Sequence, residues 1–221
     1  MSEIIKATGT ILSAAPQGDS DKRIVIETCE LGKITAFARG CRRPGSPLLA
    51  AADPFVTGTF SLIPGRNSYR LAEAEVMEYF RELADEYPGV YTGFYFLDLV
   101  DYYGREGVDG TDMLNLLYLS LKALLSSSID NELVRRIFEL RLFAVNGDYA
   151  PDPDGMDSSM FSIVQYICSS PLGKLFTFTL DSDKLIKLIR ISDKVRKQVM
   201  DRDPKSLKIM ESFRAFPEVN G

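Results

Sequence analysis

Histidine is absent from the 221 residues of this chain. That absence removes the Ser-His-Asp triad, the Cys-His pair, the HExxH zinc motif and every histidine-ligated metal site. The sequence also lacks a GxxxxGK phosphate loop and a GxGxxG dinucleotide fingerprint. Most common enzyme chemistries are thereby excluded, so we expect a protein that is not an enzyme and that uses no cofactor.

Cysteine is scarce, and long apolar runs are missing. The three cysteines, Cys29, Cys41 and Cys168, are widely spaced and form no CxxC motif, which excludes a disulfide framework and a four-thiolate zinc site. No apolar run is long enough to span a bilayer. The start of the chain, Met1 to Ser13, is typical of a strand rather than a signal peptide. We therefore expect a cytoplasmic protein without membrane contact.

The net charge of −5 is distributed unevenly along the chain. Residues 1–80 are neutral in sum, residues 81–157 carry six basic against fifteen acidic side chains, and residues 158–221 carry eleven basic against seven acidic ones. A uniform field of the whole protein therefore cannot be what attracts a partner.

The first eighty residues have the pattern of a β-domain. Short runs rich in Ile, Val, Thr and Phe are separated by turn residues. The expected strands are Ile4–Ser13, Lys22–Thr28, Lys33–Ala38, Phe55–Ile63 and Tyr69–Val76. Five strands in so short a stretch predict a small barrel of the OB type, although a different five-stranded barrel would show much the same pattern.

From Pro88 the apolar period becomes helical. The expected helices are Val90–Tyr103, Asp112–Ser126, Glu132–Val145, Ser158–Ser169, Ser182–Met200 and Lys205–Phe213, with Thr111 and Asp130 as N-caps and a strand at Lys174–Leu180. The fold class is thus α+β, a barrel followed by a helical body. We divide it into a barrel domain (1–80), a helical domain (81–157) and a C-terminal helical segment (158–221) packed on that domain.

Basic side chains gather between residues 33 and 70 with one acid, Asp53, among them. They are Lys33, Arg39, Arg42, Arg43, Arg66 and Arg70, and the rings of Phe37, Phe60 and Tyr69 are interleaved with them. Cations that neutralise phosphates, beside rings that stack on bases, are what a groove for single-stranded nucleic acid needs. Phe37 and Phe60 could equally fill the barrel core.

Two further features concern charge. The helix after Leu180 carries a basic face, Lys184, Lys187, Arg190, Lys194 and Lys197, which would meet DNA, an acidic peptide or water. Pairs of aspartates, Asp19/Asp21, Asp152/Asp154, Asp181/Asp183 and Asp201/Asp203, are spaced like fragments of Mg²⁺ sites. Because each pair lies where a turn or cap is expected, we interpret them as caps and turns and predict no metal site.

The run from Gly32 to Leu48, GKITAFARGCRRPGSPL, resembles the RecO family of bacterial recombination mediators. The segments DPFVTGTF from Asp53, LAEAE from Leu71, RIFELRL from Arg136 and RDPKSLK from Arg202 resemble the family in the same order. The resemblance implies an N-terminal OB-fold with a helical body, and binding to single- and double-stranded DNA in the RecF pathway of DNA repair, at the nucleoid. It also implies strand annealing and help in loading RecA onto DNA coated by single-stranded-DNA-binding protein (SSB), with RecR and the acidic C-terminal tail of SSB as partners.

Carried over by residue, the resemblance places the DNA surface on Lys33, Arg39, Arg42 and Arg43, with Arg66, Arg70 and Tyr69 as extensions. Candidates for the SSB-tail site are Arg135, Arg141, Lys187, Arg190 and Lys194. Many relatives carry a four-cysteine zinc site after the counterpart of Gly147–Pro151, but residues 152–159 contain no cysteine here. We therefore expect packing rather than zinc to hold the C-terminal segment. The alternatives are a protein-binding adaptor and a Mg²⁺-dependent nuclease.

Overall fold

The structure, a computed structural model, describes residues 3–85 and 89–214. Its contacts divide the chain into two compact units. The barrel unit comprises the described residues up to 81 together with residues 97–114, and the helical unit comprises residues 82–96 and those from 115 onward. Residues 97–114, which we had assigned to the helical domain, thus group with the barrel, and two helices contribute to both units.

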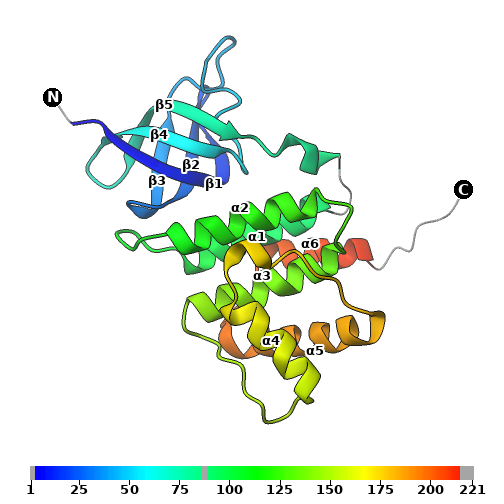
Figure 1. Cartoon of the computed structure of the whole chain (residues 1–221). Coiled ribbons are helices and arrows are strands. Elements are labelled where there is room, and N and C mark those ends of the chain that lie inside the picture. Colours follow the sequence, from blue (N-terminus) through cyan, green and yellow to red (C-terminus); the bar gives the residue numbers. More distant parts are fainter. Residues whose placement is uncertain (1–2, 86–88, 215–221) are drawn as a thin grey trace, which may run out of the picture. The chain divides into compact units, whose positions relative to one another are not determined.

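Five strands form a closed barrel in the order β1-β2-β3-β5-β4. They are β1 (Ile5–Gln17), β2 (Asp21–Thr28), β3 (Gly32–Ala38), β4 (Thr57–Pro64) and β5 (Tyr69–Glu78), drawn in blue to cyan-green in Figure 1. All neighbours are antiparallel except β3 and β5, which are parallel. The predicted OB-type barrel is confirmed.

The barrel core follows from the two-residue period of its strands. In β3 the side chains of Ile34, Ala36 and Ala38 point inward and are buried, while those between them remain partly exposed. Phe60 of β4 is fully buried in this core, as the apolar interpretation of that residue expected. Closure leaves the sheet without a free edge. Because the apolar side chains point into the barrel, the polar side chains of the strands lie on its outer surface.

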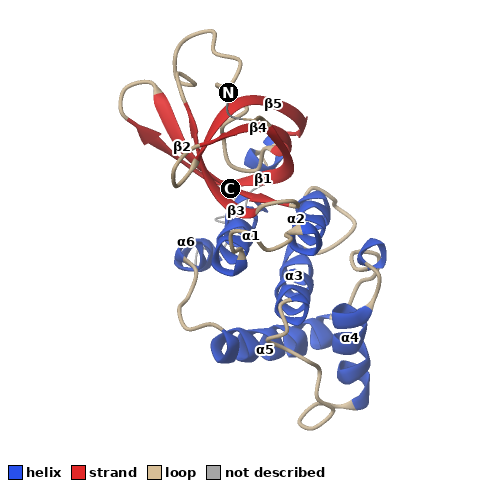
Figure 2. Ribbon diagram, turned by 90° about the vertical axis from the view of Figure 1, so that its left-hand side faces the viewer, coloured by secondary structure: helices blue, strands red, loops and turns tan. Residues whose placement is uncertain are grey.

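The rest of the chain is helical. It forms η1 (Arg81–Ala84), α1 (Gly89–Tyr103), α2 (Thr111–Leu124), α3 (Asn131–Val145), α4 (Ser158–Ser169), η2 (Leu172–Lys174), α5 (Ser182–Val199) and α6 (Lys205–Arg214). In the helical unit α3 packs against both α4 and α5, the blue helices labelled in Figure 2. None of the helices among the described residues is long and apolar enough to cross a membrane.

The predicted strand at Lys174–Leu180 is wrong. Lys174 ends a short 3-10 helix. Its main-chain oxygen accepts a hydrogen bond from the hydroxyl of Thr177 at 2.9 Å, so this oxygen is bonded within the segment rather than to a neighbouring strand.

Of the paired aspartates, Asp181 caps α5 and Asp152 accepts the nearby Asp154 amide as expected, whereas Asp21 lies in β2 and accepts the amide of Gly40. The Asp130 carboxylate accepts the first amides of α3.

Candidate nucleic-acid interface

A row of alternating cationic and aromatic side chains crosses the outer face of the barrel. The strand register sets Arg23 of β2 opposite Phe37 of β3, and Phe37 opposite Arg70 of β5. Both arginines are exposed and Phe37 is half-buried. Arg23 also donates to the Thr35 hydroxyl at 3.2 Å. Because directly paired residues project to the same side of a sheet, the Phe37 ring lies between two guanidinium groups.

Beside this row the barrel is hollowed. The hollow, which we call the β3–β5 hollow, has a volume of about 230 Å³ and is lined by Phe37, Arg39, Ile63, Pro64, Gly65, Ser68, Tyr69 and Arg70. It therefore unites the end of β3 with the β4–β5 hairpin. Two of its walls are rings and two are cations, the combination that receives a base next to its phosphate.

The segment that follows β3, residues 39–56, is called the basic loop here. Its Arg39, Arg42 and Arg43 are exposed, whereas Cys41 between them is fully buried in the barrel core. Leu48 and Ala52 anchor the rest of the loop in the same core. Buried apolar side chains therefore anchor the loop in the barrel core, while its guanidinium groups face the solvent.

The outer surface of β2 and β3 is called the β2–β3 face here. Arg23 and Phe37 lie at one end of it, Glu27 and Lys33 lie at the other, and residues 101–110 cover that second end. Lys33 Nζ lies 3.2 Å from the Asp101 carboxylate and also donates to the main-chain oxygen of Asp101. Its cross-strand neighbour Glu27 is 0% exposed, and neither carboxylate oxygen has a hydrogen-bond partner among the described residues. A Cβ atom on Gly104 or Gly110 would lie 2.2 or 2.5 Å from those oxygens.

Burial raises the pKa of Glu27 to about 7, against the opposing effect of the nearby Lys33 ammonium. Lys33 is paired with the half-exposed Asp101, at the opposite end of β3 from Phe37. Of the residues predicted for DNA contact, the structure brings Arg39, Tyr69 and Arg70 to one hollow. Arg66 is exposed on the adjoining hairpin, and Arg42 and Arg43 lie on the basic loop.

Sequence reasoning missed Arg23 as a site residue and left Phe37 undecided. The run Arg23–Glu27 is nearly continuous in apolar residues and therefore indicates a buried strand. It does not predict that Arg23, at the beginning of the run, is exposed. The alternation of β3 was the available signal for Phe37, since it occupies the same parity as Lys33 and Thr35.

The candidates for partner binding differ in exposure. Lys187, Arg190 and Lys194 are exposed on α5, and Lys187 Nζ pairs with the Asp157 carboxylate at 2.9 Å. Arg190 and Lys194 share a face with the exposed apolar side chain of Ile186, because residues four apart lie on one side of a helix. This surface, Ile186, Arg190 and Lys194, is called the α5 face below.

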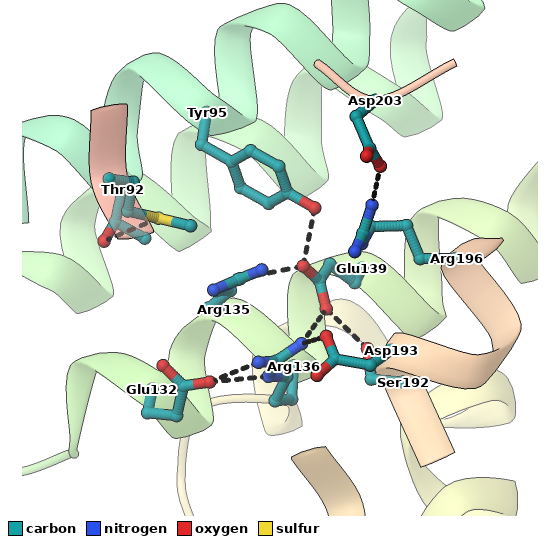
Figure 3. A network of polar contacts seen from close by, with 11 residues as sticks. Thr92, Tyr95, Glu132, Arg135, Arg136, Glu139, Ser192, Asp193, Arg196 and Asp203 are labelled. Atoms are coloured by element: carbon teal, nitrogen blue, oxygen red, sulfur yellow. Dashed lines mark hydrogen bonds and ion pairs between the residues drawn. The ribbon is translucent and has the colours of Figure 1, made fainter. Parts of the chain in front are cut away.

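Arg135 is buried within the helical unit instead, and Arg141 is half-buried. Arg135 is 1% exposed, its Nε donates to Glu139 at 2.8 Å, and its guanidinium lies over the Tyr95 ring (Figure 3). Arg141 donates to the main-chain oxygen of Cys168. Both guanidinium groups hold helices together, so we leave them out of the proposed partner surface.

Glu139 is the centre of that buried network (Figure 3). Its carboxylate accepts from Tyr95 at 2.6 Å, from Ser192 of α5 at 2.5 Å and from Arg136 at 2.9 Å. Burial by itself would raise the pKa of Glu139, but Arg135 and Arg136 outweigh it and lower the pKa to about 2. The carboxylate is therefore ionised, and it joins α1, α3 and α5 within the helical unit.

Comparison with known proteins gives a consistent result. A family model described as "Recombination protein O N terminal" matches residues 1–80. "DNA repair protein RecO" of Alkaliphilus metalliredigens is 35% identical over 65% of this chain, and that of Caldicellulosiruptor saccharolyticus is 33% identical over 66%. These matches span 58% and 59% of the relatives' own lengths.

A third relative extends the match to the C-terminal helices. "DNA repair protein RecO" of Clostridium perfringens is 22% identical over 96% of this chain and 99% of its own length. The barrel, the matched N-terminal domain and the nearly full-length alignment agree in order and extent. Residues 1–80 belong to the N-terminal domain family of RecO, and the chain is similar to RecO proteins along nearly its whole length.

Proposed function

We propose that this protein is a non-catalytic DNA-binding protein of DNA repair and recombination, and that it binds single-stranded DNA across the open half of the β2–β3 face. The observation that carries the proposal is the row Arg23–Phe37–Arg70 beside the β3–β5 hollow. Relatives named DNA repair proteins support the same role.

The position of the row agrees with how OB barrels work. Oligonucleotides bind such barrels on the face of strands 2 and 3 and between the loops that join strands 1–2 and 4–5. Here the row lies on β2 and β3, the hollow is closed by the β4–β5 hairpin, and the basic loop adds three exposed arginines. Cations supply salt-dependent affinity for phosphates, and rings supply stacking that tolerates any sequence. The exposed cations would also contact the backbone of double-stranded DNA.

The test replaces Arg39, Arg42 and Arg43 together by alanine and measures fluorescence anisotropy of a labelled oligonucleotide at several salt concentrations, without added metal. We expect weaker binding and a salt slope that is smaller by about 2, because each phosphate contact on a single strand contributes about 0.7. The matched control is Lys6→Ala, which removes an exposed cation lining a different hollow, on β1. An unchanged slope in the triple variant would remove the basic loop from the interface.

The same titration separates the alternatives. A peptide-binding adaptor predicts no salt-dependent affinity for DNA. A Mg²⁺-dependent nuclease predicts cleavage of the labelled strand when Mg²⁺ is added, whereas the proposed protein shifts DNA between states without cutting it.

The finer role that we propose is to anneal complementary strands and help load RecA onto DNA coated by SSB, together with RecR. Within this role the acidic C-terminal tail of SSB would bind the α5 face. That face joins two exposed cations, which attract an acidic peptide, to an exposed apolar side chain that adds contact area.

Reversing Lys187, Arg190 and Lys194 to glutamate should weaken binding of a labelled SSB-tail peptide by tenfold or more, because attraction becomes repulsion. Affinity for a bare oligonucleotide should change far less, since the DNA face lies on the barrel. The control is Lys208→Glu, a single reversal on α6. Retained peptide affinity in the triple variant would place the tail site elsewhere.

A further inference from the structure

An acidic side chain holds the beginning of the basic loop. Asp21, the first residue of β2, accepts the Gly40 main-chain N–H on Oδ1 at 2.8 Å and the Ser20 hydroxyl on the same atom at 3.2 Å. The Gly40 amide is the main reason that the pKa of Asp21 is lowered from its usual range, and Arg39 and Arg43 act in the same direction. Asp21 therefore remains an ionised acceptor at neutral pH.

Gly40 is where the chain leaves β3 and turns into the basic loop. Its φ of +65° is in the left-handed region, which glycine adopts without the penalty of a side chain. The residue before it, Arg39, lines the β3–β5 hollow. A bond to the Gly40 amide therefore fixes the peptide unit that joins Arg39 to the loop.

The β1–β2 turn adds bonds on the same side. The main-chain N–H of Arg42 donates to the Ser20 oxygen at 2.9 Å, and the Arg42 guanidinium donates to the Gly18 oxygen at 3.2 Å. At the far part of the loop, Lys22 Nζ lies 2.5 Å from the Asp53 carboxylate. Consecutive residues at the start of β2 thus hold two separate points of the basic loop.

From this geometry we propose that Asp21 is a positioning residue for DNA binding: its carboxylate orders the turn at Gly40 and so directs Arg39 to the β3–β5 hollow. The inference rests on the proposed function of that hollow. It opposes the simple electrostatic expectation, because an acid within a cationic site repels phosphate and its removal alone would strengthen binding.

The positioning role predicts that loss of Asp21 weakens DNA binding, whereas electrostatics alone predicts that it strengthens binding, so the test separates the two. In the anisotropy titration, Asp21→Ala should bind single-stranded DNA about threefold to tenfold more weakly although it gains one unit of positive charge, because the Gly40 amide loses its acceptor. Asp21→Asn, which keeps an acceptor oxygen at the same reach, should bind as well as the unaltered protein or better. Asp21→Glu keeps the charge but moves the oxygen, and should resemble the alanine variant.

The matched control is Asp19→Ala. Asp19 is exposed in the turn that precedes β2 and makes no side-chain hydrogen bond with the described residues, so its loss should strengthen binding slightly. Circular dichroism checks that each variant is folded. If Asp21→Ala fails to fold, Asp21→Glu and Asp21→Asn still separate position from charge.

Binding by Asp21→Ala that equals or exceeds that of Asp19→Ala would overturn the positioning role, as would an asparagine variant as weak as the alanine variant. Failure of the proposed function has a different result, since DNA binding would then also survive loss of Arg39, Arg42 and Arg43. This inference fails by itself if the arginine variant binds DNA weakly and the Asp21 variants bind it as well as the unaltered protein.

Discussion

At the scale of single residues, Phe37 is an apolar ring on the solvent side of a barrel strand. It lies between Arg23 and Arg70 in the strand register, and each strand spacing is about 4.8 Å, so the backbones that carry the two arginines are about 10 Å apart with Phe37 on the strand between them. A base stacked on that ring would have a cation on each side for its neighbouring phosphates. Charge and stacking can therefore be separated by mutation.

We predict that Phe37→Ala weakens binding of a single-stranded oligonucleotide by about 1–3 kcal/mol, the usual contribution of one stacked base, while the salt slope stays constant. Arg23→Ala should instead lower the slope by about 0.7. Both are measured by anisotropy at several salt concentrations. Phe37→Leu serves as the control that keeps apolar volume without a ring face. Equal binding by the unaltered protein, Phe37→Ala and Phe37→Leu would show that no base stacks there.

The arginines of the basic loop could be predicted from the sequence as candidates for DNA contact, but the row could not. Arg42 and Arg43 lie at the start of a turn-rich loop, where arginine is not needed to fill a core, so their exposure is predictable. The pairing of Phe37 with Arg70 depends on a parallel contact between β3 and β5, which are about thirty residues apart in the chain. No local pattern encodes that register.

At the scale of elements, a buried ionic network joins α3 to α5. Arg136 pairs with Glu139 at 2.9 Å and with Asp193 of α5 at 2.6 Å, and Ser192 donates to Glu139 (Figure 3). Pairing is required here because an isolated buried charge is far costlier than a paired one. The network therefore holds α5 against α3.

We predict that Glu139→Gln lowers the free energy of unfolding by about 3–5 kcal/mol, since it leaves Arg135 and Arg136 buried without their common counter-charge. Chemical denaturation followed by circular dichroism measures the change. Asp193→Asn is the comparison, because that carboxylate is 38% exposed and its loss should cost about 1 kcal/mol or less. Similar losses for the two variants would mean that burial of Glu139 has no energetic weight.

Apart from the strand wrongly predicted at 174–180, the predicted strands and helices match the structure to within four residues at each end. Periodicity and caps determine them locally, as with Asp130 before α3. The network was not predictable, because Arg135 and Arg136 have the same residue type as surface cations, and only the packing of α3 against its neighbours shows that they are buried.

At the scale of the whole molecule, stability should depend on pH through Glu27. Its pKa is raised by burial to about 7 from an ordinary 4.5, with Lys33 and Asp101 as the charged groups nearest to it. Between those values the unfolded chain releases the proton and the folded protein keeps it. Stability therefore falls as pH rises from about 4.5 to 7, and the cost is fully present above 7.

We predict that Glu27→Gln raises the melting temperature at pH 8 and has much less effect at pH 5, corresponding to about 3 kcal/mol across the window. Thermal melts at both pH values measure this difference. Glu73→Gln, an exposed carboxylate of β5, is the control and should leave the pH profile unchanged. A Glu27→Gln variant with the pH profile of the unaltered protein would mean that this carboxyl is ionised throughout.

The cover over Glu27 and Lys33 also limits the footprint on nucleic acid. Residues 101–110 occupy one end of the β2–β3 face, so a strand of DNA has only the end with Arg23, Phe37 and Arg70 to lie on. We expect each molecule to occlude a number of nucleotides near the lower end of the range of about 4–16 known for OB folds. Copies bound along one strand would then leave short stretches of bases uncovered between them, open to pairing with a complementary strand.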